Sequence, residues 1–157
     1  MGKSTFINSY AGKACAKTGN KPGVTRGAQW IKLNRQLELL DTPGILWPKF
    51  EDETTGIHLA FTGAVKDEIM DLETLACHLI ELLARRYPQA LAERYKLEAD
   101  PGLPGWELLE LCGKKRGFRI SGGEVDTERM SRILLDEFRG GKLGRFTLEL
   151  PPEGESA

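Results

Sequence analysis

The sequence predicts an α/β unit of one helix and a β-hairpin, followed by a mostly α-helical domain. A helix is expected over residues 4–11, directly after a Gly-Lys-Ser-Thr turn. Two short apolar runs, at 29–33 and 37–40, surround an Asn-Arg turn and predict the hairpin. From residue 72 onward, leucine and alanine recur at helical spacing. This change of pattern predicts a domain boundary near residue 65.

The helical domain is predicted to contain four helices and one short strand. The first helix begins after Asp71, because an aspartate side chain accepts hydrogen bonds from the free N–H groups of a helix start. Two shorter helices are expected over 89–97 and 106–112, between proline and glycine breaks. Asp126 is expected to cap the fourth helix. Alternating polar and apolar residues over 145–150 predict a half-buried strand.

The composition is that of an ordinary globular chain. It is 40% hydrophobic and 29% charged, which excludes a disordered protein, and no apolar run approaches the roughly 20 residues of a spanning helix. The first residues lack the apolar core of a signal peptide. The cysteines are odd in number, far apart and without a metal-binding spacing, which indicates reduced thiols. We therefore expect a cytoplasmic protein without a membrane partner.

Charge is distributed unevenly along the chain. Residues 1–50 contain eight Lys and Arg against two acidic residues, whereas residues 51–111 contain thirteen acidic and five basic residues. A basic first third suits an anionic ligand, either a nucleotide or RNA, and a solvated charged face is the alternative. A second basic cluster is the best RNA candidate of the helical domain, against the alternative of a solvated loop: Lys114, Lys115, Arg116 and Arg119.

Gly2-Lys3-Ser4-Thr5 matches the second half of the phosphate-binding P-loop motif G-x-x-x-x-G-K-[ST]. In this loop, backbone N–H groups and the N-terminus of a helix hold phosphate oxygens. Lys3 is expected to reach the β- and γ-phosphates, and the Ser4 hydroxyl is expected to bind Mg²⁺. Taken alone, the four residues also fit a simple glycine turn with a serine helix cap.

Two further motifs follow in the order that a GTPase requires. Asp41-Thr42-Pro43-Gly44 comes directly after a predicted strand, where the aspartate reaches the Mg²⁺ shell and the Gly44 N–H faces the γ-phosphate. Thr25 lies in a predicted mobile loop between the two motifs, where a switch threonine binds Mg²⁺ only while the γ-phosphate is present. The predicted nucleotide-binding residues are Gly2, Lys3, Ser4, Thr5, Thr25, Asp41 and Gly44, and the predicted metal ligands are Ser4, Thr25 and Asp41.

The order of the motifs predicts a circularly permuted domain. The guanine-reading sequence Asn-Lys-x-Asp, which follows Asp-x-x-Gly in Ras-like GTPases, does not occur after Gly44. A helical domain begins there instead, so the guanine-reading half is expected upstream of the P-loop. Residues 1–65 are therefore predicted to be the C-terminal part of a permuted P-loop GTPase domain. Residues 66–150 are predicted to be a helical domain with a candidate RNA-binding surface, and residues 151–157 a disordered tail.

Four segments closely resemble the ribosome biogenesis GTPase A family (RbgA or YlqF): GKSTFIN at 2–8, AKTGNKPGVTR at 16–26, QWIKL at 29–33 and LLDTPGILWPKF at 39–50. The resemblance extends to about Leu97 and is looser beyond it. It implies a cytoplasmic, circularly permuted GTPase, here truncated at its N-terminus, with GTP and Mg²⁺ as cofactors. It also implies that the partner is the immature large ribosomal subunit, with the helical domain contacting its rRNA; no DNA partner is expected.

The catalytic residue stays unassigned. Ile45 stands where Ras-like enzymes place the glutamine that orients the attacking water, so intrinsic hydrolysis is expected to be slow and to depend on a partner. His58 and His78 are interpreted as ordinary helix residues, and the three tryptophans as buried packing residues. Two other functions stay open: a fragment of another P-loop GTPase, or a non-enzymatic remnant that binds RNA through its helical domain.

Overall fold

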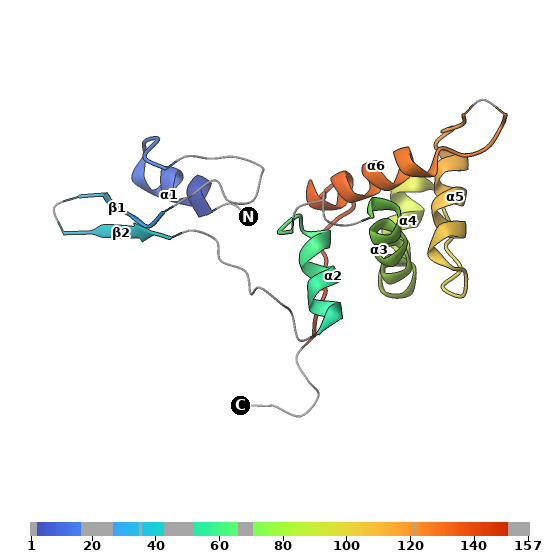
Figure 1. The fold of residues 1–157 in the computed structure, drawn as a ribbon, viewed down its shortest axis with the longest axis horizontal. Helices are drawn as coiled ribbons and strands as arrows, with labels where there is room; N and C mark the ends of the chain where they lie inside the picture. The colour runs from blue at the N-terminus through green and yellow to red at the C-terminus, as the bar shows by residue number, and fades with distance from the viewer. Residues whose placement is uncertain are drawn as a thin grey trace.

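A computed structural model describes residues 3–16, 27–34, 36–42, 52–65, 71–120 and 122–150. Within these ranges the chain forms one two-stranded antiparallel sheet and a set of helices, with α1 next to the sheet and α2 to α6 grouped together (Figure 1). The elements are α1 (Lys3–Ala11), β1 (Gln29–Lys32), β2 (Glu38–Asp41), α2 (Glu53–Phe61), α3 (Leu72–Arg86), α4 (Pro88–Tyr95), α5 (Gly105–Lys115) and α6 (Thr127–Arg139).

The helix and hairpin predicted for the first part of the chain are confirmed. β1 pairs with β2 so that Ile31 lies opposite Leu39. Asn34 closes the turn, because its side-chain oxygen accepts hydrogen bonds from the N–H groups of Gln36 and Leu37, at 2.8 and 2.9 Å. The hydrophobic cluster of this part is small, with three buried residues: Ile7, Ala16 and Ile31.

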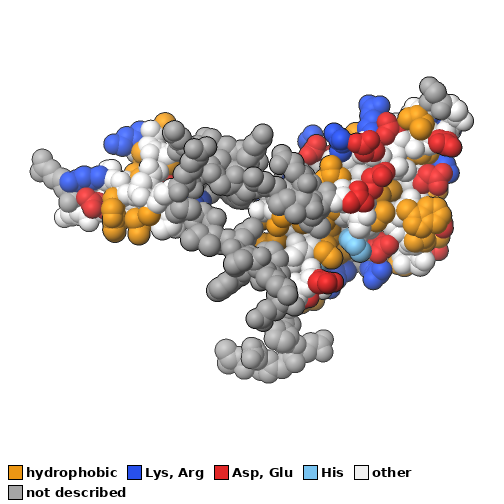
Figure 2. All heavy atoms as spheres, viewed as in Figure 1, with side chains coloured by type: hydrophobic (Ala, Val, Ile, Leu, Met, Phe, Trp, Pro, Cys, Tyr) orange, Lys and Arg blue, Asp and Glu red, His pale blue; other side chains and the backbone are white. Residues whose placement is uncertain are grey.

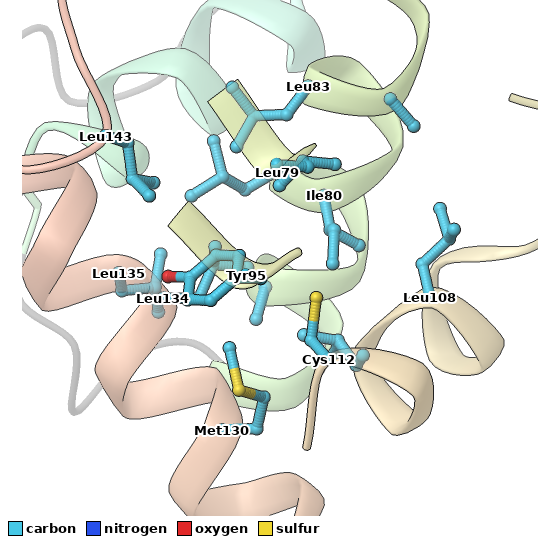
Figure 3. Close-up of a cluster of buried hydrophobic side chains, with 14 of the residues drawn as sticks. Leu79, Ile80, Leu83, Tyr95, Leu108, Cys112, Met130, Leu134, Leu135 and Leu143 are labelled. Carbon is cyan, nitrogen blue, oxygen red and sulfur yellow. The ribbon is translucent and has the colours of Figure 1, made fainter. Parts of the chain in front are cut away.

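The helical part is built around α3, which packs against α5 and α6. Its apolar face is buried as the leucine spacing predicted, and Leu79 and Ile80 face side chains of the two neighbouring helices (Figure 3). Asp71 caps α3 by accepting hydrogen bonds from the N–H groups of Glu73 and Thr74, and Asp126 caps α6 in the same way. Both predicted caps are confirmed.

Helix α2 was not expected from the sequence. Asp52 caps it by accepting a hydrogen bond from the Thr54 N–H at 2.9 Å. Its last residues, Ala60 and Phe61, are buried in the same core as α3. Arg139 of α6 donates hydrogen bonds from Nε to the Phe61 carbonyl and from Nη2 to the Ala60 carbonyl, both at 3.0 Å. By packing, α2 therefore joins the helices that follow it, although it precedes the boundary expected near residue 65.

The strand predicted over 145–150 is wrong. This segment has no strand partner among the described residues, and side chains satisfy its backbone instead. The Tyr87 hydroxyl donates to the Thr147 carbonyl at 2.9 Å and accepts from the Thr147 N–H at 3.1 Å. Arg86 donates to the Leu148 carbonyl at 2.9 Å. The alternation that predicted a strand reflects half-buried Phe146 and Leu148, which pack on the helical core.

Two of the three tryptophans are not buried as predicted. Trp30 and Trp106 are 69% and 60% exposed, and Trp47 lies outside the described residues. All three cysteines are free, and burial raises the pKa of the Cys112 thiol to about 12. None of the described helices combines the length and the apolar character that crossing a membrane requires.

Candidate functional site

The start of α1 and the end of β2 meet at one point. Lys3, the first residue of α1, contacts the Asp41 carboxylate and the Thr42 carbonyl oxygen through its Nζ. The Lys3 side chain is about half exposed, whereas Asp41 is only 1% exposed. Residues that are 38 positions apart in the sequence are thus in direct contact. The two motifs that predicted a phosphate site contribute to a single location.

Asp41 is held in place by its partner on the neighbouring strand. Gln29 lies opposite Asp41 in the sheet register, and its Nε2 donates to Asp41 Oδ2 at 3.2 Å. A buried carboxylate is costly unless a cation or hydrogen-bond donors compensate it. Lys3 supplies the cation, and Gln29 supplies a hydrogen-bond donor. A carboxylate oxygen is also a hard ligand of the kind that Mg²⁺ prefers. The chemistry of Asp41 therefore fits a metal-binding role.

Ser4 and Thr5 follow Lys3 in the first turn of α1. Ser4 is half-buried, and Thr5 is exposed. The first N–H groups of any helix have no partner within the helix, and the helix dipole adds a partial positive charge there. The first turn of α1 is thus suited to an anion beside Asp41. Three predicted site residues lie outside the described residues, together with Ile45: Gly2, Thr25 and Gly44.

Asn8 has a positioning role that the sequence reading missed. Its Oδ1 accepts hydrogen bonds from the N–H groups of Cys15 and Ala16, at 2.9 and 2.8 Å. Its Nδ2 donates to the Ala16 carbonyl at 2.8 Å. These hydrogen bonds fix the backbone of Cys15 and Ala16 after α1, where the predicted switch loop begins. The available signal was an asparagine inside a helix, which is unfavourable there unless its side chain serves another segment.

The predicted RNA-binding cluster divides into different environments. Lys114 forms an ion pair with Glu110, at 2.7 Å between Nζ and Oε1. Arg116 is half-buried, lies 3.5 Å from the Glu137 carboxylate and covers the rings of Tyr95 and Phe118. Lys115 and Arg119 are exposed. Lys114 is exposed as well but is paired with Glu110, so Lys115 and Arg119 are better placed for a nucleic-acid contact. Arg116 serves the packing of the domain.

The two histidines differ in their surroundings. His58 of α2 is buried, and its Nδ1 lies 3.0 Å from Glu149 Oε1, a residue 91 positions away. Such a partner has no helical spacing that a sequence pattern could reveal. His78 of α3 is exposed. Neither histidine lies among the contacts described for Lys3 and Asp41.

A helix that opens with a P-loop sequence, and whose lysine meets the aspartate of an Asp-x-x-Gly motif at a strand end, is typical of a P-loop nucleotide-binding protein. Comparison with known families agrees. Residues 1–100 match the family model of the 50S ribosome-binding GTPases, and the chain belongs to that family.

Relatives within the family are similar along nearly the whole chain. The chain is 50% identical over 153 residues to ribosome biogenesis GTPase A of Bacillus cereus, covering 98% of this chain and 51% of the relative. It is 48% identical over 155 residues to ribosome biogenesis GTPase A of Priestia megaterium, covering 99% of this chain and 54% of the relative. The chain thus spans about half the length of these curated relatives.

Solved structures show the same relationship. A GDP-bound YlqF structure superimposes with a TM-score of 0.65 at 27% identity, covering 97% of this chain and 57% of that chain. A GNP-bound YlqF from Thermotoga maritima gives a TM-score of 0.58 at 28% identity, covering 96% of this chain and 55% of that chain. The resemblance to ribosome biogenesis GTPase A that the motifs predicted is confirmed.

Proposed function

We propose that this chain carries the phosphate- and Mg²⁺-binding part of a GTPase that acts in assembly of the large (50S) ribosomal subunit. The observation that carries the proposal is the contact between Lys3 and Asp41, which joins two nucleotide motifs at one point. The family of the chain and its similarity to ribosome biogenesis GTPase A support the same proposal. A circularly permuted motif order and a cytoplasmic location complete it.

In this proposal Lys3 binds the β- and γ-phosphate oxygens of GTP. Lys3 is the first residue of α1, and its ammonium contacts Asp41 at the end of β2. The N–H groups of the first helical turn, including those of Ser4 and Thr5, also attract anions. Gly2 would let the backbone approach the phosphates closely, and the Gly44 N–H would face the γ-phosphate. Asp41 holds the Lys3 ammonium beside the start of this loop–helix junction through their direct contact.

The proposed Mg²⁺ ligands are the Ser4 hydroxyl, the Thr25 hydroxyl and the Asp41 carboxylate. When bound, Mg²⁺ neutralises negative charge that develops on the phosphates during hydrolysis. Gln29 keeps the Asp41 carboxylate in a fixed orientation, so one of its oxygens is directed toward the start of α1. Ile45 cannot hydrogen-bond to the attacking water, so hydrolysis would be slow until the large subunit or another group orients that water.

The proposed partner is the large subunit and its rRNA, contacted by the helical part. The exposed cations of the basic cluster are Lys115, Arg119 and Lys114, which pairs with Glu110, while Arg116 has a supporting role. Exposed lysine and arginine bind RNA phosphates and release counterions, so such a contact weakens with added salt.

Binding of a fluorescent GTP analogue to the full-length protein tests the proposal. Lys3→Ala should weaken binding by about 10- to 100-fold, because a charge-assisted phosphate contact is worth roughly 1.5–3 kcal/mol. Lys13→Ala is the matched control, since Lys13 is an exposed lysine outside the site. Asp41→Asn should weaken binding in Mg²⁺ but much less in EDTA. Unchanged binding by Lys3→Ala would remove Lys3 from the site, and RNA binding without any GTP binding would favour the non-enzymatic alternative.

A further inference from the structure

Helices α3 and α5 and the turn before α6 enclose an open groove of about 440 Å³, away from the phosphate site. Its apolar surface comes from Trp106, Leu109 and Val125. Three carboxylates stand around this surface: Glu73, Glu110 and Glu124. Among the described residues that line the groove, there is neither a lysine nor an arginine. On the face shown in Figure 2, hydrophobic side chains over α5 lie among Asp and Glu side chains.

Two close contacts of α5, one with α3 and one with the turn before α6, fix the walls of the groove. A Cβ added at Gly105 would lie 2.5 Å from the Cys77 carbonyl oxygen, so the start of α5 rests directly on α3. The Gly105 N–H also donates to Glu81 of α3 at 2.7 Å. Near the other end of α5, a Cβ at Gly113 would lie 2.3 Å from the Val125 side chain. Both contacts fix the walls, so a ligand would meet a preformed surface.

The electrostatic character of the groove is negative. Burial, followed by the carboxylates of Glu81, Glu73 and Asp71, raises the pKa of the Cys77 thiol in its wall. Lys114 lies one helical turn after Glu110 and forms an ion pair with it at 2.7 Å. Both side chains of this pair are substantially exposed, which makes the pair weak and exchangeable. A cation from another molecule can therefore replace Lys114 on Glu110.

We propose that this groove binds a lysine- and arginine-rich peptide segment of a protein partner. The aliphatic stem of a Lys or Arg side chain fits the apolar surface of Val125 and Trp106, while its charged end reaches a carboxylate. Trp106, which is largely exposed, offers its ring face to the same cation. Carboxylates repel RNA phosphates, so the groove is a different surface from the basic cluster at the end of α5. The inference does not depend on GTP binding.

The charge of Lys114 has opposite effects on peptide binding in the groove and on RNA binding at the basic cluster. In the peptide site, Lys114 competes with the incoming cation for Glu110. At the basic cluster, Lys114 adds a positive charge that favours RNA. Lys114→Gln should therefore strengthen binding of a cationic peptide and weaken binding of RNA. A general change in folding would alter both in the same direction.

Fluorescence polarisation with the full chain tests this proposal. The probe is a fluorescein-labelled peptide, Gly-Lys-Arg-Gly-Lys-Arg-Gly-Lys, and its control has glutamine at every Lys and Arg. Glu110→Gln with Glu124→Gln should weaken binding of the cationic peptide by roughly tenfold, the effect of two exposed ion pairs. Glu93→Gln with Glu98→Gln removes the same charge from exposed positions outside the groove and should change binding less than about twofold.

Further variants separate a specific groove from general attraction. Trp106→Ala should weaken peptide binding by about threefold through loss of the cation–π contact. Binding of poly-uridine RNA should not weaken in the groove variants. Equal losses in the two double variants, weaker peptide binding by Lys114→Gln, or no difference between the cationic and glutamine peptides would each overturn the proposal.

Discussion

Glu137 of α6 accepts a hydrogen bond from the Tyr95 hydroxyl at 2.7 Å, inside the helical core. Arg94 donates to the same carboxylate from Nε at 3.0 Å, and Arg116 lies 3.5 Å away. The hydrogen bond from Arg94 outweighs burial and lowers the pKa of Glu137 below its ordinary value. One carboxylate therefore joins α4, the end of α5 and α6.

Glu137→Gln should destabilise the chain by about 1–3 kcal/mol at pH 7, because a buried charged hydrogen-bond acceptor is lost. The lowered pKa means that Glu137 contributes stability above about pH 4.5 and loses it as the pH falls further, through the pKa in the folded protein. The difference in unfolding free energy between wild type and variant should therefore narrow as the pH falls below about 4.5. Urea unfolding at several pH values measures this difference in the free energy of unfolding. Glu128→Gln, in an exposed ion pair on the same helix, is the control and should cost well under about 1 kcal/mol.

Gly105→Ala should destabilise the helical part by about 1–3 kcal/mol, because the added methyl group would meet backbone atoms of Cys77 that cannot move independently. Urea unfolding followed by circular dichroism measures the change. Gly102→Ala is the control, since a Cβ there meets only the exposed carboxylate of Asp100, at 3.2 Å, which needs to shift by only a few tenths of an ångström. Equal stability of both variants would mean that α3 and α5 separate without cost.

Hydrogen exchange should differ between the two parts of the 157-residue chain. Amides of β1 and β2 should exchange at least about tenfold faster than those in the middle of α3, since an isolated hairpin is marginal in water. The helix and hairpin bury only a small cluster, and Phe6 and Leu40 stay exposed, whereas α3 lies in the large core. Mass spectrometry of peptic fragments gives the rates. Equal protection in both parts would show that the hairpin is stable on this small core.

Lys115→Glu with Arg119→Glu should weaken binding to large-subunit rRNA. The magnitude of the slope of log affinity against log salt should fall by roughly 1.5. Fewer counterions are released on binding when two phosphate contacts are lost. Arg116 is left unchanged, since its ion pair with Glu137 would confound binding with stability. Lys142→Glu with Arg145→Glu, two exposed cations elsewhere, is the matched control. An unchanged slope would identify the cluster as a solvated surface that does not contact RNA.

Elements with strong local signals could be predicted from the sequence. Asp71 and Asp126 mark helix starts through their own side chains, and the Asn34 turn closes the hairpin locally. The contact of Lys3 with Asp41 could be anticipated because both residues belong to motifs with a fixed order. These features depend on neighbours in the chain, or on a known chemical requirement for the phosphate site.

Other features depend on distant partners and leave little trace in the sequence. Helix α2 contains a glycine and two threonines, which are poor helix formers, and burial of Phe61 together with Arg139 holds it in place. The segment 145–150 alternates like a strand, but Tyr87, rather than another strand, supplies its hydrogen bonds. Trp106 is apolar and large, yet it lies at the rim of a groove that only the packing of three elements creates.

The anchoring of α2 by Arg139 also limits where the proposed phosphate site can lie. Residues 42–51 are the whole connection between Asp41 and the cap of α2, so the fully extended chain lets Asp41 lie at most about 40 Å from that cap. A partner that binds the helical part consequently keeps Lys3 and Asp41 close to the surface of that partner. A group on that surface would then meet the phosphate site at an effective concentration in the millimolar range, even where its own affinity for the site is weak.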